Sequence, residues 1–194
     1  MKRQFSIRKI VVAAICHLTA LLFSACGLLP DITPIPHEAI HGEDLLTLTN
    51  DEIYYEVYRN LLDLVDTFPT EADALSEMSP QQRTVYILNI YDMEMQNGGL
   101  CQFFVNSSRC LAPDLDACLE TVGAEEHRQL LAEFVSKNNI DLQDLDSFNI
   151  FSIQDYTKQT ERYDFDSYDN TYYMELPPLS DYIANYIKAN ITHF

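Results

Sequence analysis

The chain has 194 residues and a formal net charge of −18, from 30 acidic and 12 basic residues. This length suits one domain behind a leader. The acidic excess disfavours nucleic acid and anionic lipid as direct partners, and it suits a basic protein, divalent cations or a solvated surface.

Residues 1–25 have the organisation of a cleaved export signal. Four basic residues precede an apolar run at 10–23, which is too short for a comfortable membrane span. The sequence Phe23-Ser-Ala-Cys26 resembles the lipobox of bacterial lipoproteins, with phenylalanine in place of the usual leucine. We therefore predict lipidation at Cys26 and anchoring in the cell envelope, outside the cytoplasm. The alternative is an ordinary signal with an unrelated cysteine.

Residues 26–48 are predicted to be the lipidated N-terminus and a linker, because Pro30, Pro34 and Pro36 interrupt any regular pattern. The signal peptide holds four of the basic residues and none of the acidic ones. The remaining chain therefore carries eight basic against 30 acidic residues, a formal charge of −22.

Apolar residues at helical spacing predict a single all-α domain over 49–194. No segment shows the alternation of apolar and polar residues that is typical of a β-strand. Thr49 or Asn50 can cap the first helix, and Ser79, Pro80 and Gln82 suit the start of the second. Between residues 163 and 178 we expect an acidic, tyrosine-rich loop. Helices are expected at 50–68, 80–97, 99–107, 113–122, 124–137 and 152–162, and from a cap at Ser180.

His37-Glu38-Ala-Ile-His41 matches the H-E-x-x-H pattern of zinc peptidases. On a helix this spacing places two imidazoles on one metal, with the glutamate as general base. The match lies in the proline-containing linker and has no persuasive third ligand, so a zinc hydrolase is the alternative rather than the leading hypothesis.

The acidic run from Asp164 to Glu175 resembles a calcium loop at its first, third and twelfth positions. Tyr168 and Asp169 stand where such a loop needs a ligand and a glycine. The run therefore predicts an acidic surface loop, with passive binding of cations as a second alternative. No cofactor is predicted.

Few other residues suggest chemistry. His127 lies between Glu126 and Arg128 and is expected to be exposed, whereas Cys101 is expected to be a buried, inert thiol. Cys101, Cys110 and Cys118 could form one disulfide, or all three could be small buried groups. Nothing in the linear order indicates a catalytic triad, so a non-enzymatic protein is expected.

The predicted first helix carries an acidic stripe that is a candidate interaction surface. It spans about 21 Å, so four carboxylates give one charge per ~5 Å, against one per ~1.7 Å in duplex DNA. One stripe alone cannot imitate a duplex. Its carboxylates are those of Glu52, Glu56, Asp63 and Asp66.

A motif around a doubled glycine consists of Glu94, Asn97, Gly98, Gly99, Gln102, Phe103, Phe104, Asn106, Ser107 and Ser108. This motif resembles that of a bacterial family of DNA-mimic-protein-like domains. The resemblance extends from about Asn50 to the C-terminus, and Leu100 and Arg109 depart from the usual pattern. We interpret the motif as structural: the glycines turn the chain, Phe103 and Phe104 point inward, and Gln102 bonds to the helix ends exposed there, as does Asn106.

The resemblance implies an all-α fold. It also implies binding of a basic protein by surface carboxylates, because the family's mimic member occupies the DNA-binding face of a repressor and is dimeric. A homodimer is therefore a further expectation. The leading hypothesis is a lipid-anchored, acidic, non-enzymatic domain that binds a basic protein partner.

Overall fold

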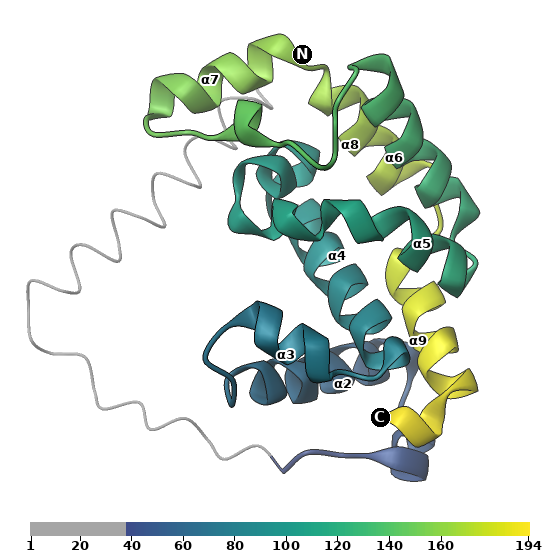
Figure 1. Ribbon diagram of the computed structural model, residues 1–194. Helices are drawn as coiled ribbons and strands as arrows, with labels where there is room; N and C mark the ends of the chain where they lie inside the picture. The colour runs from purple at the N-terminus through teal and green to yellow at the C-terminus, as the bar shows by residue number, and fades with distance from the viewer. Residues whose placement is uncertain (1–37) are drawn as a thin grey trace, which may run out of the picture. The chain divides into compact units, whose positions relative to one another are not determined.

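The computed structural model describes residues 38–194, of which residues 39–194 fold into one all-α unit (Figure 1). The predicted signal peptide, Cys26 and His37 lie outside the described residues. No strand occurs in the part that is described, and no helix there is long and apolar enough to cross a membrane. Its helices are η1 (Gly42–Thr47), α2 (Asn50–Val65), α3 (Glu71–Glu77), α4 (Pro80–Val105), η2 (Ser107–Leu111), α5 (Ala112–Val122), α6 (Glu125–Lys137), η3 (Asp146–Phe148), α7 (Ile153–Arg162), α8 (Phe165–Met174), α9 (Leu179–Ala189) and η4 (Ile191–His193).

Local capping sets the starts of the two helices that the sequence indicated most clearly. Thr49 accepts a hydrogen bond from the backbone N–H of Glu52, and the Glu52 side chain accepts one from Thr49. Ser79 and Gln82 form the same reciprocal pair at the start of α4, where Pro80 is the first helical residue. Both capping boxes pair backbone groups that a helix end leaves unbonded.

The long helix α4 is the centre of the fold. It packs against α2, α5, α8 and α9, and its residues are buried along most of its length. After its kink, Phe103 and Phe104 are fully buried, as expected. The Phe104 ring stacks on Phe148 with centroids 4.7 Å apart and lies 5.5 Å from Phe134. An aromatic cluster therefore joins α4 to α6 and to the segment before α7.

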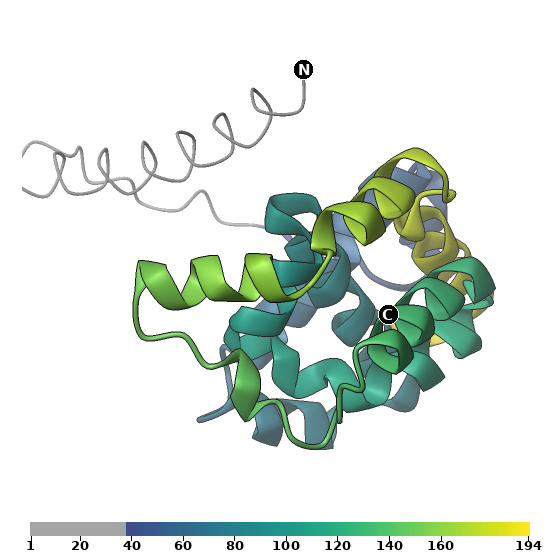
Figure 2. The same cartoon turned by 90° about the horizontal axis from the view of Figure 1, so that it is seen from above.

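Three local expectations are wrong. The short helix α3 was not anticipated, and the expected loop at 163–178 contains α8, whose aromatic residues Phe165, Tyr168 and Tyr172 face the core. The last helix begins at Leu179 with Pro178 at its N-cap, so Ser180 does not cap it. α7 lies at the edge of the unit in both views and buries only one of its residues, Gln159 (Figure 2).

The two ends of the described chain meet. The backbone N–H of Gly42 donates to the carbonyl of Phe194 at 2.8 Å, and η1 packs against η4. α2 packs along α9 beside this contact. The first and last helices of the unit therefore hold each other in place.

Candidate functional site: the kinked motif and the acidic groove on the second helix

The doubled glycine breaks the helical geometry of α4: two helical segments meet at a kink at Gly99, where the sequence predicts one helix to end and the next to begin. Gly99 has φ 76° and ψ −169°, a conformation open almost only to glycine. Asp169 of α8 lies against it and accepts a hydrogen bond from the Leu100 N–H at 2.7 Å. A Cβ atom added at Gly99 would lie 2.0 Å from the Asp169 carboxylate. Gly99 therefore lets a buried carboxylate reach the backbone at the kink.

The same contact rules out a calcium loop at 164–175. A calcium loop wraps its oxygen ligands around one ion, whereas Phe165–Met174 is helical. Asp169 is buried and bonded to α4 instead.

A second carboxylate, that of Glu94, ties the two halves of α4 together. It accepts hydrogen bonds from Gln102 Nε2 at 2.7 Å, from Asn106 Nδ2 at 3.0 Å and from Ser108 Oγ at 2.6 Å. The expectation that Gln102 and Asn106 bond to helix ends is therefore wrong, because both donate to Glu94. Ionised acceptors of this kind give the stronger hydrogen bonds.

The remaining motif residues have simpler surroundings. A Cβ atom at Gly98 would lie 2.2 Å from Gln102 Oε1, so a small residue is needed there as well. Asn97 and Ser107 are exposed at the surface. The polar part of the motif thus surrounds one kink and its carboxylate.

A buried polar cluster that the sequence did not reveal lies next to this kink. Asp92 accepts hydrogen bonds from Tyr54 Oη at 2.7 Å and from Tyr172 Oη at 2.5 Å. Burial raises the pKa of Tyr54 well above its usual range, and the Asp92 carboxylate adds to the effect. Both phenols stay protonated and donate. The cluster joins α2, α4 and α8 and contains no nucleophile.

His127 belongs to the core, contrary to the expectation that it is exposed. It is 1% exposed, and its ring packs edge-on against Tyr172 with centroids 5.0 Å apart. Nε2 lies 2.8 Å from the Pro177 carbonyl, so this nitrogen carries the proton in the neutral ring. Nδ1 is buried and has no partner among the described residues. Burial lowers the pKa of His127 because it disfavours the charged imidazolium.

The described part of the H-E-x-x-H segment does not have the geometry that zinc peptidases use. Residues 38–41 are not helical, and His41 is extended with φ −133°. The Ile40 N–H donates to Glu56 Oε1 at 2.9 Å. Among residues 38–194, no three His, Cys, Asp or Glu side chains are grouped so that they could hold a metal ion. This backbone does not present Glu38 and His41 on one helical face.

Cys101, Cys110 and Cys118 are all free thiols. Cys101 and Cys118 are buried, and burial raises the pKa of each thiol to about 11. Cys110 is exposed. The two buried thiols therefore act as small apolar groups.

The four carboxylates of the predicted stripe share one face of α2, and Arg59 lies in the middle of that face. Glu52, Asp63 and Asp66 are exposed, and Glu56 is half-buried. Elsewhere some acidic side chains have basic partners: Arg128 lies within ion-pair distance of Asp116, Glu120 and Glu125. Within the described residues, Glu52, Asp63 and Asp66 form no such ion pair.

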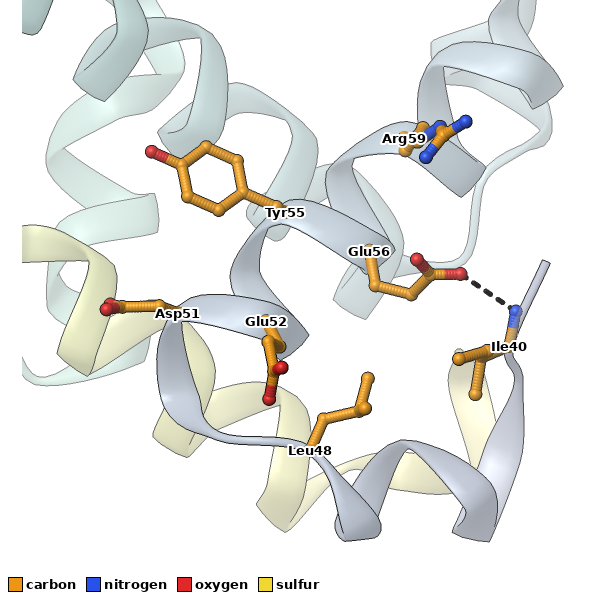
Figure 3. Close-up of a pocket in the computed structure, with 7 residues that line it drawn as sticks. All are labelled: Ile40, Leu48, Asp51, Glu52, Tyr55, Glu56 and Arg59. Carbon is orange, nitrogen blue, oxygen red and sulfur yellow. Dashed lines mark hydrogen bonds between the residues drawn. The ribbon is translucent and has the colours of Figure 1, made fainter. Parts of the chain in front are cut away.

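The N-terminal half of this stripe borders a surface groove of about 370 Å³ (Figure 3). The groove lies between α2 and the segment that leads into it. Glu52 and Glu56 both line it, whereas Asp63 and Asp66 lie further along the helix. The structure therefore divides the predicted interaction surface into two parts. The complete lining consists of Ile40, Leu48, Asp51, Glu52, Tyr55, Glu56 and Arg59.

Comparison with known proteins identifies the family. A search of curated proteins and a search of solved structures each gave no match. The family model described as DMP19-like protein matches residues 76–190, which is more than half of the chain. The match begins within α3, so it includes the kinked motif but not α2 and its groove. With the match and the motif in agreement, the chain belongs to the DMP19-like protein family, the DNA-mimic family that the sequence around Gly98 and Gly99 resembles.

Proposed function

We propose that the protein is a lipid-anchored, non-enzymatic domain of the cell envelope that binds a basic protein partner through its carboxylates. The observation that carries this proposal is the charge of the described residues. Residues 38–194 contain 29 acidic and eight basic side chains. A surface of this sign attracts cationic proteins and repels nucleic acid.

Membership of the DMP19-like family supports a protein partner. The acidic stripe of α2 supports an electrostatic contact, because its exposed carboxylates form no ion pair within the described residues. Its charge density is too low for the stripe alone to replace duplex DNA, and Arg59 lowers it further. Mimicry of DNA would therefore need carboxylates from several helices acting together.

Capture from envelope extracts tests the proposed partner. The full-length protein is immobilised in detergent, and bound proteins are eluted with salt from 0.1 to 1 M. The Debye length falls from about 10 Å to about 3 Å over this range, so a partner held by charge elutes within it. Heparin, a soluble polyanion, should release the same protein at low salt. A sole partner that stays bound in 1 M salt and ignores heparin would overturn the electrostatic part of the proposal.

The anchor has a separate test. Labelled palmitate should be incorporated into the wild-type protein and not into the Cys26→Ala variant, and the wild-type protein should fractionate with membranes. Equal labelling of the two proteins would remove Cys26 as the lipidation site.

A further inference from the structure

The groove on α2 has walls of two chemical kinds. Ile40 and Leu48 supply apolar surface, and both are only partly buried. Asp51 and Tyr55 lie one helical turn apart and point in the same direction (Figure 3). Tyr55 is 61% exposed, although it is a large aromatic residue at the edge of the core. The groove thus offers an aromatic face beside a carboxylate.

The tyrosine is fixed in position by the core beneath it. The Tyr55 ring packs edge-on against Tyr54, with centroids 5.1 Å apart and planes at 86°. Tyr54 is buried and donates to Asp92 on α4. The exposed face of Tyr55 is therefore held in place without a ligand, which lowers the entropic cost of binding.

Two of the groove's carboxylates are also fixed before any ligand binds. Glu56 accepts a hydrogen bond from the Ile40 N–H at 2.9 Å. Glu52 accepts from the Thr49 N–H at 2.9 Å and from the Thr49 hydroxyl at 2.8 Å. These bonds lower the pKa of Glu52, so it is charged at neutral pH. Asp51 is exposed to solvent and takes no part in the capping box, which is formed by Thr49 and Glu52.

We propose that this groove binds an arginine side chain of the basic partner, with the guanidinium stacked on Tyr55 and bonded to Asp51. Arginine fits better than lysine because its planar group stacks on aromatic rings and is weakly hydrated. Arg59 lines the opposite end of the groove from Asp51, so it repels the ligand least at this position (Figure 3). This inference rests on the proposed function, since it names the chemistry by which the partner is recognised.

Two peptides of equal charge test the assignment. Hexa-arginine amide and hexa-lysine amide are titrated into the full-length protein in detergent at 0.15 M salt, and binding is followed by amide chemical shifts. Hexa-arginine is expected to bind more tightly, with the largest shifts at Asp51 and Tyr55. Tyr55→Ala should weaken hexa-arginine roughly two- to fivefold and remove its advantage over hexa-lysine.

Charge variants separate the groove from the rest of the acidic stripe. Asp51→Asn should weaken both peptides roughly two- to fivefold. Asp63→Asn removes the same charge from the same helix about 12 Å from Tyr55. Only the end residues of a hexapeptide centred on Tyr55 approach Asp63, so this variant should weaken binding less than Asp51→Asn. Circular dichroism confirms that each variant is folded.

The outcomes distinguish this inference from the proposed function. If Asp51→Asn, Tyr55→Ala and Asp63→Asn bind both peptides alike, the groove is not the arginine site, but general binding of basic proteins is not contradicted. If the groove variants alone weaken arginine binding while envelope capture yields no salt-sensitive partner, the result supports arginine binding by the groove and contradicts the proposed basic protein partner. If neither peptide binds even at low salt, the groove assignment is overturned.

Discussion

Replacing Gly99 by alanine should destabilise the domain far more than replacing another glycine that also has a positive φ. Gly99 combines a positive φ of 76° with a neighbouring carboxylate, and an added Cβ atom would lie 2.0 Å from Asp169 Oδ2. Asp169 must therefore move away, and the buried Leu100 N–H then loses its acceptor.

Two costs add up in the Gly99→Ala variant. A non-glycine residue in this backbone conformation costs about 1–3 kcal/mol. A buried N–H left without its partner costs about 1–3 kcal/mol more. The middle of the combined range is about 4 kcal/mol, a large part of the ~5–15 kcal/mol that stabilises a typical domain. In a domain of this size each kcal/mol lowers Tm by about 2–4 °C, so Tm should fall by roughly 8–16 °C.

Urea unfolding followed by circular dichroism at 222 nm measures the change, and Gly123→Ala is the control at a second glycine with positive φ, in the left-handed helical region. Gly123 has φ 75°, but a Cβ atom there would meet nothing within 4 Å. Its replacement should cost only about 1–2 kcal/mol. In the Asp169→Ala background, Gly99→Ala should cost much less than in the wild-type protein, because the obstructing carboxylate is gone. Equal losses at Gly99 and Gly123, or equal effects of Gly99→Ala in both backgrounds, would refute the reasoning.

Three further predictions concern buried or bonded side chains. Glu94→Gln should lower the free energy of unfolding by about 1–3 kcal/mol, because an amide cannot accept all three hydrogen bonds that Gln102, Asn106 and Ser108 donate to the Glu94 carboxylate. Urea unfolding measures this against the exposed control Glu161→Gln, and equal stability of the two variants would contradict it. Because its pKa is lowered in the folded state, His127 should stabilise the domain fully above its unfolded pKa of ~6.5 and less as pH falls below that value. The unfolding free energy of His127→Gln should therefore fall less between pH 7.5 and 5.5 than that of the wild type, and parallel pH profiles would disprove the assignment. Among the three thiols of the described residues, Cys110 should react first with a disulfide reagent at pH 8, and Cys101 and Cys118 only after urea is added. Rapid reaction of all three in the native state would show that the core opens there.

Features that depend on neighbours in the chain could be predicted from the sequence. The start of α2 follows from Thr49 and Glu52, and the start of α4 from Ser79 and Gln82, because each cap is made within four residues. The left-handed end of α5 at Gly123 is equally local. These signals do not require knowledge of the tertiary fold.

The errors arose where a distant segment decides the environment. Asp169 is a poor residue for a buried helix face, and the kink at Gly99 supplies a backbone donor to it, the Leu100 N–H. Phe165, Tyr168 and Tyr172 have the spacing of one helical face. Because the acidic Asp169 lies among them, the segment resembled a surface loop rather than the buried helix α8. The charged neighbours of His127 misled in the same way, although His127, Leu131 and Phe134 follow one helical face.

Sequence analysis could predict only the part of the candidate site that lies on α2. The carboxylates of α2 follow from helical spacing, but the groove also needs Ile40 and Leu48 from the segment before the helix. The path of that segment depends on the bond between Ile40 and Glu56 and on the pairing of η1 with η4. No local pattern predicts these contacts.

The hydrogen bond between Gly42 and Phe194 places the two ends of the described unit next to each other. A circular permutant could therefore join residue 194 to residue 38 through a linker, which keeps Ile40 in the groove, and open the chain between α6 and η3, leaving every helix intact. In such a protein the new ends would lie beside the aromatic cluster of Phe104, Phe134 and Phe148, far along the chain from the groove. Attachment to a surface through those ends would present α2 in a different direction while keeping its side chains in place.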